Sequence, residues 1–191
     1  PAGERVLSDE ELVEQALTSG DEVVKNQAAA TLIARQRNSM GQIRRLYAET
    51  DDPAVRATCI QGMGRLYDYQ SMDLLLDAME DPSPLVRARA NAAVVRMIGL
   101  DGHFDANGPL EDRKRIIGFY RLQWDKLRGS GALAEFEQTV EARYGDKASF
   151  AASVHRLSSE ISARASDTCR TWGSTSLIDG SINLAGTPSG R

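Results

Sequence analysis

The sequence predicts an all-α fold: a right-handed α-solenoid of three helix pairs, followed by a C-terminal helical cap and an irregular tail. Two observations lead to this prediction. Segments that begin at Asp21, Asp52 and Ser83 match one another without gaps at an interval of 31 residues. Within each segment, apolar side chains recur at the i, i+4, i+8 spacing of one face of an α-helix. Helix pairs of this kind bury their apolar stripes by stacking on one another, which builds an elongated solenoid.

Each 31-residue unit divides into a first and a second helix. We predict helix pairs at 8–19 and 21–36, at 40–50 and 52–67, and at 70–80 and 83–98. The apolar positions of the second helices match as Val24, Val55 and Val86, as Ala28, Cys59 and Ala90, and as Leu32, Met63 and Val94. Those of the first helices match as Leu12, Ile43 and Leu74, as Ala16, Tyr47 and Ala78, and as Leu17, Ala48 and Met79.

The second helices begin with residues that suit a helix N-terminus. Asp21, Asp52 and Ser83 each carry a side-chain oxygen that can accept an unpaired amide of the first turn. Pro53 and Pro84 follow two of these caps, at the first helical position, where a missing N–H costs nothing. A cation stands four residues after each cap: Lys25, Arg56 and Arg87.

The repeat ends at Gly99, and a cap is predicted to follow. Turn-forming residues fill 100–108, where a calcium loop in register with Asn107 would place Lys114 at its twelfth position instead of the required Glu. A helix is predicted from Pro109 through Trp124. Its apolar face is expected to cover the open end of the stack and comprises Ile116, Ile117, Tyr120 and Trp124.

The rest of the chain is predicted to hold two more helices and a tail. The helices are expected at 132–144 and 148–171. The Gly/Ser/Thr-rich tail carries four residues more apolar than a linker requires: Leu177, Ile178, Ile182 and Leu184. The predicted organisation is three repeats at 1–100, a helical cap at 101–172 and a flexible or partner-docking tail at 173–191.

The repeats resemble the HEAT family, in the short-repeat branch found in bacterial HEAT repeat domain-containing proteins. The resemblance rests on Asp52-Pro53-Ala54-Val55-Arg56 and on the segment from Asp81 to Ala90, and it covers about residues 8–100. It implies an α-solenoid that is used for binding. It also implies a structural role for the repeated arginines, Arg56 and Arg87, which would join the acidic caps of adjacent units.

Composition argues against several other function classes. The chain has 23 Lys+Arg against 27 Asp+Glu, and a net charge of −4 does not favour nucleic-acid binding. No apolar stretch approaches the roughly 18 residues of a membrane span. Two cysteines, Cys59 and Cys169, and two histidines, His103 and His155, form no recognisable catalytic or metal-binding motif. We therefore predict no enzymatic activity, no cofactor and no metal site, and we expect Cys59 to be a buried core residue.

The predicted function is a non-catalytic scaffold or adaptor that binds another protein. Arg65 and Arg96 stand 31 residues apart and are expected to line one groove at successive levels. The apolar residues of the tail are expected to dock, as an extended strand, on a partner or on the chain's own groove. The net charge slightly favours a partner of positive potential. The start at Pro1 suits a cytoplasmic protein and an exported one equally.

Two alternative functions remain at this stage. A nucleic-acid-binding repeat would use a basic ladder on the inner face, composed of Lys25, Arg56, Arg87, Arg65, Arg89 and Arg96. A lyase or accessory enzyme subunit, as known among short HEAT-like proteins, is the second alternative, although no set of residues here matches such an activity.

Overall fold

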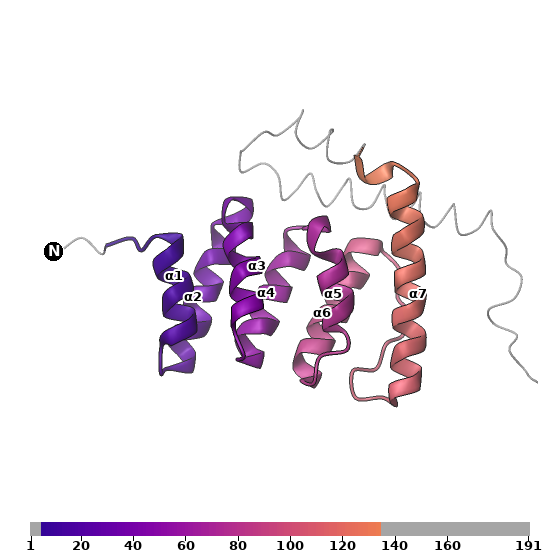
Figure 1. Cartoon of the computed structure of the whole chain (residues 1–191), viewed down its shortest axis with the longest axis horizontal. Helices are drawn as coiled ribbons and strands as arrows, with labels where there is room; N and C mark the ends of the chain where they lie inside the picture. Colours follow the sequence, from indigo (N-terminus) through magenta and orange to yellow (C-terminus); the bar gives the residue numbers. More distant parts are fainter. Residues whose placement is uncertain (1–4, 135–191) are drawn as a thin grey trace, which may run out of the picture.

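The computed structural model describes residues 5–134, apart from the side chains of Gln36 and Arg37. This part of the chain is built of α-helices joined by short turns, which confirms the predicted all-α solenoid. Figure 1 shows the helices in two layers, with α1, α3 and α5 in front and α2, α4 and α6 behind. Helix α7 stands at the end of the stack, next to α5 and α6.

The helix bounds agree closely with the predicted ranges. The first helices of the three pairs are α1 (Asp9–Thr18), α3 (Met40–Glu49) and α5 (Met72–Ala78). The second helices are α2 (Glu22–Ala34), α4 (Pro53–Arg65) and α6 (Pro84–Ile98). The 3₁₀ turns η1 (Gln36–Ser39) and η2 (Tyr69–Ser71) precede α3 and α5, and α7 (Leu110–Gly129) follows the pairs.

A continuous apolar core runs between the two layers. The matched positions of the second helices lie in it at every level and are at most 2% exposed: Ala28, Cys59 and Ala90, then Leu32, Met63 and Val94. Val55 and Val86 are fully buried, whereas Val24 is half-buried because α2 forms the first level of the stack. The repeated small and large apolar residues therefore fill one elongated interior, as the 31-residue period predicts.

Two glycines allow α4 to lie unusually close to its neighbours. A Cβ atom on Gly62 would lie 2.6 Å from Cγ1 of Ile33 in α2. A Cβ atom on Gly64 would lie 2.6 Å from the Cβ and 2.9 Å from the Cα of Ala93 in α6. The contact with Ala93 involves backbone, so the spacing between α4 and α6 depends on the absence of a side chain at Gly64.

The register of α5 differs from the prediction by one residue. Leu74, matched to Leu12 and Ile43 in the gap-free repeat, is only half-buried, while its neighbour Leu75 is fully buried. The reason is one extra residue in the turn between α4 and α5, where Tyr67 adopts a positive φ of 50°. The buried positions of α5 therefore follow those of α3 at an interval of 32 residues: Met40 and Met72, Ile43 and Leu75, and Leu46 and Ala78.

This longer turn is held by a polar cluster around a buried carboxylate. The Asp68 carboxylate accepts hydrogen bonds from Arg44 Nε at 2.8 Å and Arg44 Nη2 at 2.7 Å. The Ser71 hydroxyl also donates to Asp68. Since the ion pair to Arg44 is bidentate, it fixes the end of α4 relative to α3.

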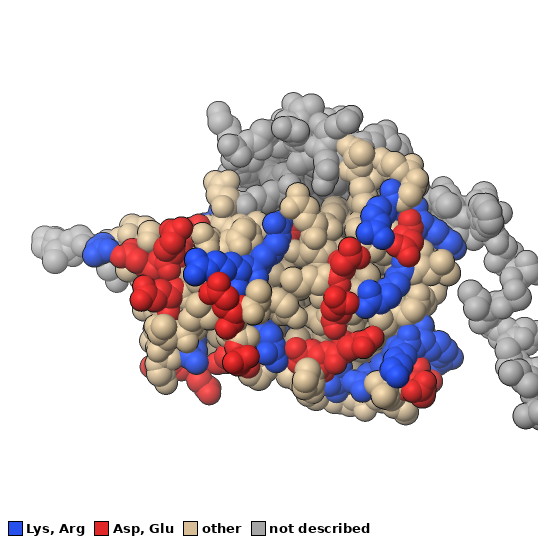
Figure 2. Space-filling view, viewed as in Figure 1, with Lys and Arg blue, Asp and Glu red and all other residues tan. Residues whose placement is uncertain are grey.

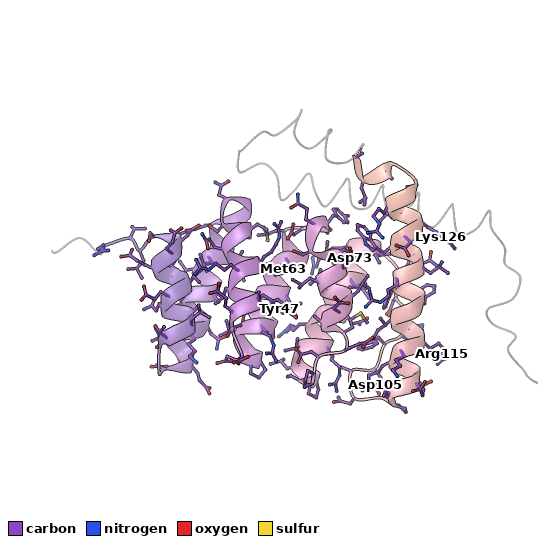
Figure 3. The ribbon with its side chains drawn as sticks, in the orientation of Figure 1. Tyr47, Met63, Asp73, Asp105, Arg115 and Lys126 are labelled. Atoms are coloured by element: carbon purple, nitrogen blue, oxygen red, sulfur yellow. The ribbon has the colours of Figure 1, made fainter. Side chains whose placement is uncertain are left out.

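Helix α7 closes the end of the stack through aromatic and polar contacts. Its buried face contains Ile117, Tyr120 and Trp124, as predicted, together with Leu127; Ile116 is half-buried. The indole of Trp124 stacks on Tyr69, with ring centroids 6.3 Å apart, and donates to Asp73 Oδ1 at 3.0 Å. Asp73 lies between α5 and α7 (Figure 3).

The loop before α7 is anchored on the same helix. The Tyr120 hydroxyl accepts the Gly102 N–H at 2.8 Å and donates to Asn91 Oδ1 of α6 at 3.2 Å. Gly99, at the end of α6, has a φ of 79° and turns the chain into this loop. The cap is thus joined to the last repeat from both its helix and its loop.

Burial also determines the chemistry of Cys59, whose thiol faces the core. Burial raises its pKa from 9.0 to about 12. In a Cys169→Ser variant, we expect native Cys59 to react with iodoacetamide at pH 9 at least about a hundredfold more slowly than the unfolded chain, because the thiolate is the reactive form. Because only the unfolded thiol ionises readily, stability should fall as pH rises from 9 towards 12. Equal rates of iodoacetamide labelling with and without urea would contradict the expected protection of Cys59.

Candidate functional site

A series of contacts joins the start of each second helix to the next level of the stack; we call it the polar ladder. Lys25 Nζ lies 3.6 Å from Asp52 Oδ2, and Arg56 Nε lies 3.2 Å from Asp81 Oδ2. At the last level, Arg87 reaches the loop before α7, where its Nε donates to the Ala106 carbonyl at 2.7 Å. The repeated cation therefore connects successive levels in all three pairs.

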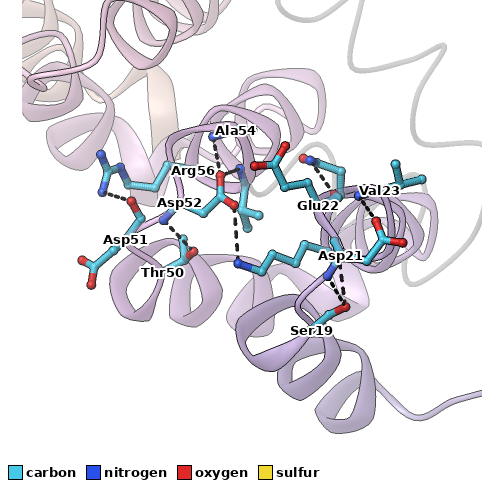
Figure 4. A network of polar contacts seen from close by, with 12 residues as sticks. Ser19, Asp21, Glu22, Val23, Thr50, Asp51, Asp52, Ala54 and Arg56 are labelled. Carbon is cyan, nitrogen blue, oxygen red and sulfur yellow. Dashed lines mark hydrogen bonds and ion pairs between the residues drawn. The ribbon is translucent and has the colours of Figure 1, made fainter.

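The aspartates of the ladder also cap helices (Figure 4). Asp21 Oδ1 accepts the Val23 N–H at 2.8 Å, and Asp52 Oδ1 accepts the Ala54 N–H at 2.8 Å. The prediction that Ser83 caps α6 in the same way is wrong, since its side chain makes no capping hydrogen bond. Ser83 still occupies the N-cap position, and Asp81 provides the carboxylate of this level: it accepts the Ser83 N–H at 2.7 Å and receives the ion pair from Arg56.

Arg87 differs from the role that the resemblance implies, because its hydrogen-bonding partners are carbonyl oxygens instead of an acidic cap. Its Nη1 donates to the carbonyls of Asp81 and Pro82, each at 2.8 Å, in addition to the bond to Ala106. The side chain is buried, and burial, followed by the charge of Arg113, lowers the pKa of its guanidinium. The level after α6 is a loop without an acidic cap, so backbone oxygens replace the carboxylate.

This difference predicts unequal effects along the ladder. Arg87→Met would leave the carbonyls of Asp81, Pro82 and Ala106 without their donor, and we expect a loss of about 2–3 kcal/mol in the free energy of unfolding. Lys25→Met removes one long ion pair and should cost less than about 1 kcal/mol. Urea unfolding followed by circular dichroism measures both. Equal losses in the two variants would show that the hydrogen bonds of Arg87 contribute no more to stability than the long ion pair of Lys25.

The polar ladder leaves one face of the second helices open to solvent. We call it the second-helix face. It comprises the same four positions in each of three helices: Val23, Gln27, Ala30 and Ala34 in α2; Ala54, Thr58, Gln61 and Arg65 in α4; and Leu85, Arg89, Ala92 and Arg96 in α6. All are exposed except Ala54 and Thr58, which are half-buried. None of the twelve is acidic.

Arg65 and Arg96 occupy equivalent positions on this face, in the last turns of the adjacent helices α4 and α6. Arg89 lies on the same face, two turns before Arg96. Against the described side chains of residues 5–134, none of these three guanidinium groups makes an ion pair or a hydrogen bond. In this respect they differ from Lys25, Arg56 and Arg87 of the polar ladder, which contact carboxylate or carbonyl oxygens of the described chain.

On the opposite side of the molecule, most of the exposed charged residues of the first helices are acidic. The exposed charged residues within α1, α3 and α5 are Glu10, Glu14, Arg45, Glu49, Asp73 and Asp77. Figure 2 views this side and shows acidic side chains over α1 and α5, with basic ones over α7. Arg121 of α7 pairs with Asp77 at 2.7 Å, and Arg128 pairs with Asp73 at 3.4 Å.

Reasoning from the sequence missed part of the second-helix face. Exposed apolar residues stand at its edge, with Val23 75% and Leu85 46% exposed. Gln61, at the centre of α4, is exposed between them. A signal existed, since all twelve positions follow the 31-residue period at a spacing of i, i+4, i+7 and i+11. The residues at these positions differ in chemistry between the repeats, so similarity between repeats does not point to them.

Two carboxylates of the loop before α7 are explained by local structure. Asp101 Oδ1 accepts the His103 N–H and Asp105 Oδ1 accepts the Asn107 N–H, each at 2.8 Å, so both carboxylates hold turns. Within residues 5–134, no three His, Cys, Asp or Glu side chains are grouped in a way that could hold a metal ion. None of the helices in this range has both the length and the apolar character required to cross a lipid bilayer.

Several predicted features lie outside the described residues. These are the helices at 148–171, nearly all of the helix at 132–144, Cys169 and His155, and the apolar residues of the tail, Leu177, Ile178, Ile182 and Leu184. The second-helix face is therefore the candidate site that the described structure supports.

Comparison with known proteins agrees with the architecture. A family model described as HEAT repeats matches residues 10–95, which span α1 to most of α6. No curated protein and no solved structure matches the chain. HEAT repeats commonly mediate interactions between proteins, and the family is typically non-catalytic. The family match, the stacked helix pairs and the shared core together identify residues 10–95 as HEAT repeats.

Proposed function

We propose that this protein is a non-catalytic scaffold or adaptor that binds another protein through the second-helix face. The proposal rests on one observation: the second-helix face presents exposed side chains at a regular spacing on three neighbouring helices. Twelve positions on three adjacent helices form a surface whose arginines have no partner among the described side chains. The rigid core behind it holds these positions at fixed intervals, which lowers the conformational cost of binding.

The polar ladder supports protein binding over the nucleic-acid alternative. Three of the six cations in the basic ladder predicted for nucleic acid are Lys25, Arg56 and Arg87. These cations already contact carboxylate or carbonyl oxygens within the fold. The three that remain, Arg65, Arg89 and Arg96, are interspersed with small and apolar residues, which suits a polypeptide better than a phosphate backbone.

Affinity capture with matched variants tests the proposal. Full-length wild-type protein, Arg65→Gln/Arg96→Gln and Arg45→Gln/Arg115→Gln are immobilised and exposed to an extract of the organism that makes the protein. The two double variants remove equal charge, but Arg45 and Arg115 lie on α3 and α7, outside the second-helix face. We expect a protein that is retained by the wild type and the control variant and lost from Arg65→Gln/Arg96→Gln. Equal retention by all three would contradict the proposed surface.

The tail is proposed as a second contact. Deletion of residues 173–191 is expected to leave the melting temperature nearly unchanged and to weaken capture of the same partner, since an extended apolar segment can add to an interface without belonging to the core. Thermal unfolding and the capture experiment measure the two effects. A large loss of thermal stability would show instead that these residues belong to the fold.

A further inference from the structure

The charges of the second-helix face point to the chemistry of its occupant. Building on the function proposed above, we infer that this face binds an acidic segment of the partner protein, in which Asp or Glu residues are interspersed with small or apolar ones. This reverses the slight preference for a positive partner that the net charge of −4 suggests. The net charge describes the whole molecule, whereas binding depends on the surface at the contact.

The first argument is local charge complementarity. The face carries Arg65, Arg89 and Arg96 and no acidic residue at its twelve positions. A guanidinium is more weakly hydrated than an ammonium group, and it can bind a carboxylate in a bidentate manner. None of the twelve positions carries an acidic residue that would offset the repulsion among the three arginines. An acidic ligand would therefore also reduce this repulsion.

The second argument is the contrast between the two sides of the stack. Five of the six exposed charged residues within α1, α3 and α5 are acidic, and the exposed cation among them, Arg45, already pairs with Glu49, so that side offers an acidic segment fewer unpaired cations. The second-helix face attracts it. An uneven distribution of charge between two sides of a small protein helps to orient a charged ligand before contact.

The third argument is the order of residues along the stack. The four positions of α2 are uncharged, those of α4 include one arginine, and those of α6 include two. Val23 and Leu85 supply exposed apolar surface at the same edge of the first and third levels. The face therefore fits a segment whose acidic residues lie over the arginines of α4 and α6 and whose apolar residues lie over Val23 and Leu85.

Nucleic acid fits the second-helix face less well than an acidic polypeptide does. A phosphate backbone carries charge at every nucleotide, and its affinity grows with the number of cations that it contacts. The face offers three cations, one on α4 and two on α6, and none on α2. The molecule as a whole carries a net negative charge. A polypeptide can instead place carboxylates only where the arginines are.

Selection of peptides from a random library tests the inference. Full-length protein is used to select 12-residue peptides, and the acidic content of the enriched sequences is compared with that of the library. We expect enrichment of peptides with net negative charge that also contain apolar residues. Binding of these peptides should weaken by about tenfold or more in Arg65→Gln/Arg89→Gln/Arg96→Gln, and should weaken with added salt, because charged contacts carry the interaction.

Controls separate this inference from the proposed function. Arg45→Gln/Arg115→Gln should bind the selected peptides like the wild type, and circular dichroism checks that all variants are folded. Enrichment of neutral or basic peptides, or no enrichment, would overturn the acidic class. If the captured protein were nevertheless lost from Arg65→Gln/Arg96→Gln, the proposed function would stand. A fluorescent single-stranded DNA 20-mer that binds more tightly than the peptides, and only when the arginines are present, would overturn it in favour of nucleic acid.

Discussion

Gly64→Val is expected to lower the free energy of unfolding by about 3 kcal/mol or more, because it forces a side chain into a contact that has no room for it. The Cβ alone would lie 2.9 Å from the Cα of Ala93, so α4 and α6 would have to separate. Their separation would also loosen the apolar rows on both sides of the contact. Urea unfolding monitored by circular dichroism measures the change.

The control for this prediction is Gly118→Val. Gly118 also lies within an α-helix, but a Cβ there meets nothing within 4 Å, so the same substitution should change stability by no more than about 0.5 kcal/mol. Ala93→Gly combined with Gly64→Val should recover part of the loss, since it removes the nearest atom. If both valine variants were equally stable, the close approach of α4 to α6 would not be a determinant of the fold.

Trp124→Ala is expected to cost about 3–5 kcal/mol, the typical effect of truncating a large buried aromatic side chain. It removes the stack on Tyr69 and the hydrogen bond to Asp73, and it leaves a cavity between α7 and α5. The guanidinium of Arg128, which lies 5.7 Å from the centre of the Trp124 ring, loses that contact as well. Because α7 covers the last level of the stack, we expect the apolar surface of α5 and α6 to become accessible.

Two measurements check the role of Trp124. Urea unfolding gives the loss of stability, and hydrogen exchange of α5 and α6 reports whether the last level opens. Leu122→Ala is the control on the same helix: its side chain is half-exposed and should contribute less than about 1 kcal/mol. Unchanged exchange in α5 and α6 in the Trp124→Ala variant would mean that α7 is not the cap of the stack.

The sequence predicted the helix pairs because the features that define them are local and repeated. The apolar rows at Ala28, Cys59 and Ala90 follow from helical spacing alone, and the cap at Asp52 follows from the residues beside it. Similarly, the face of α7 that covers the stack could be predicted from Tyr120 and Trp124. These features depend on short stretches of chain, where spacing determines the outcome.

The differences arise where contacts join distant residues. The one-residue shift of Leu74 depends on the backbone of Tyr67 and on the pairing of Asp68 with Arg44, neither of which belongs to the repeat. The Ser83 side chain makes no capping bond, and the carboxylate of this level is Asp81, which is shared between the Ser83 amide and Arg56 of the preceding level. A gap-free alignment of repeats contains no information on such contacts.

The candidate site was predicted in part. The interval between Arg65 and Arg96 placed them at equivalent positions, and the structure puts both on the exposed side of adjacent helices. The charge of the surface could not be obtained from composition, because composition sums residues from all faces. Only the fold separates the acidic residues of α1, α3 and α5 from the arginines of α4 and α6.

Photo-crosslinking from a single position tests most directly the claim that the second-helix face is the binding surface. A photoreactive phenylalanine analogue is placed at Gln61, at the centre of this face, or at Ala48, an exposed position on α3 of the opposite layer. Both full-length variants are irradiated with the captured partner. The account predicts covalent crosslinks from position 61 and none from position 48. Crosslinks from position 48 alone would place the partner on the first helices and contradict it.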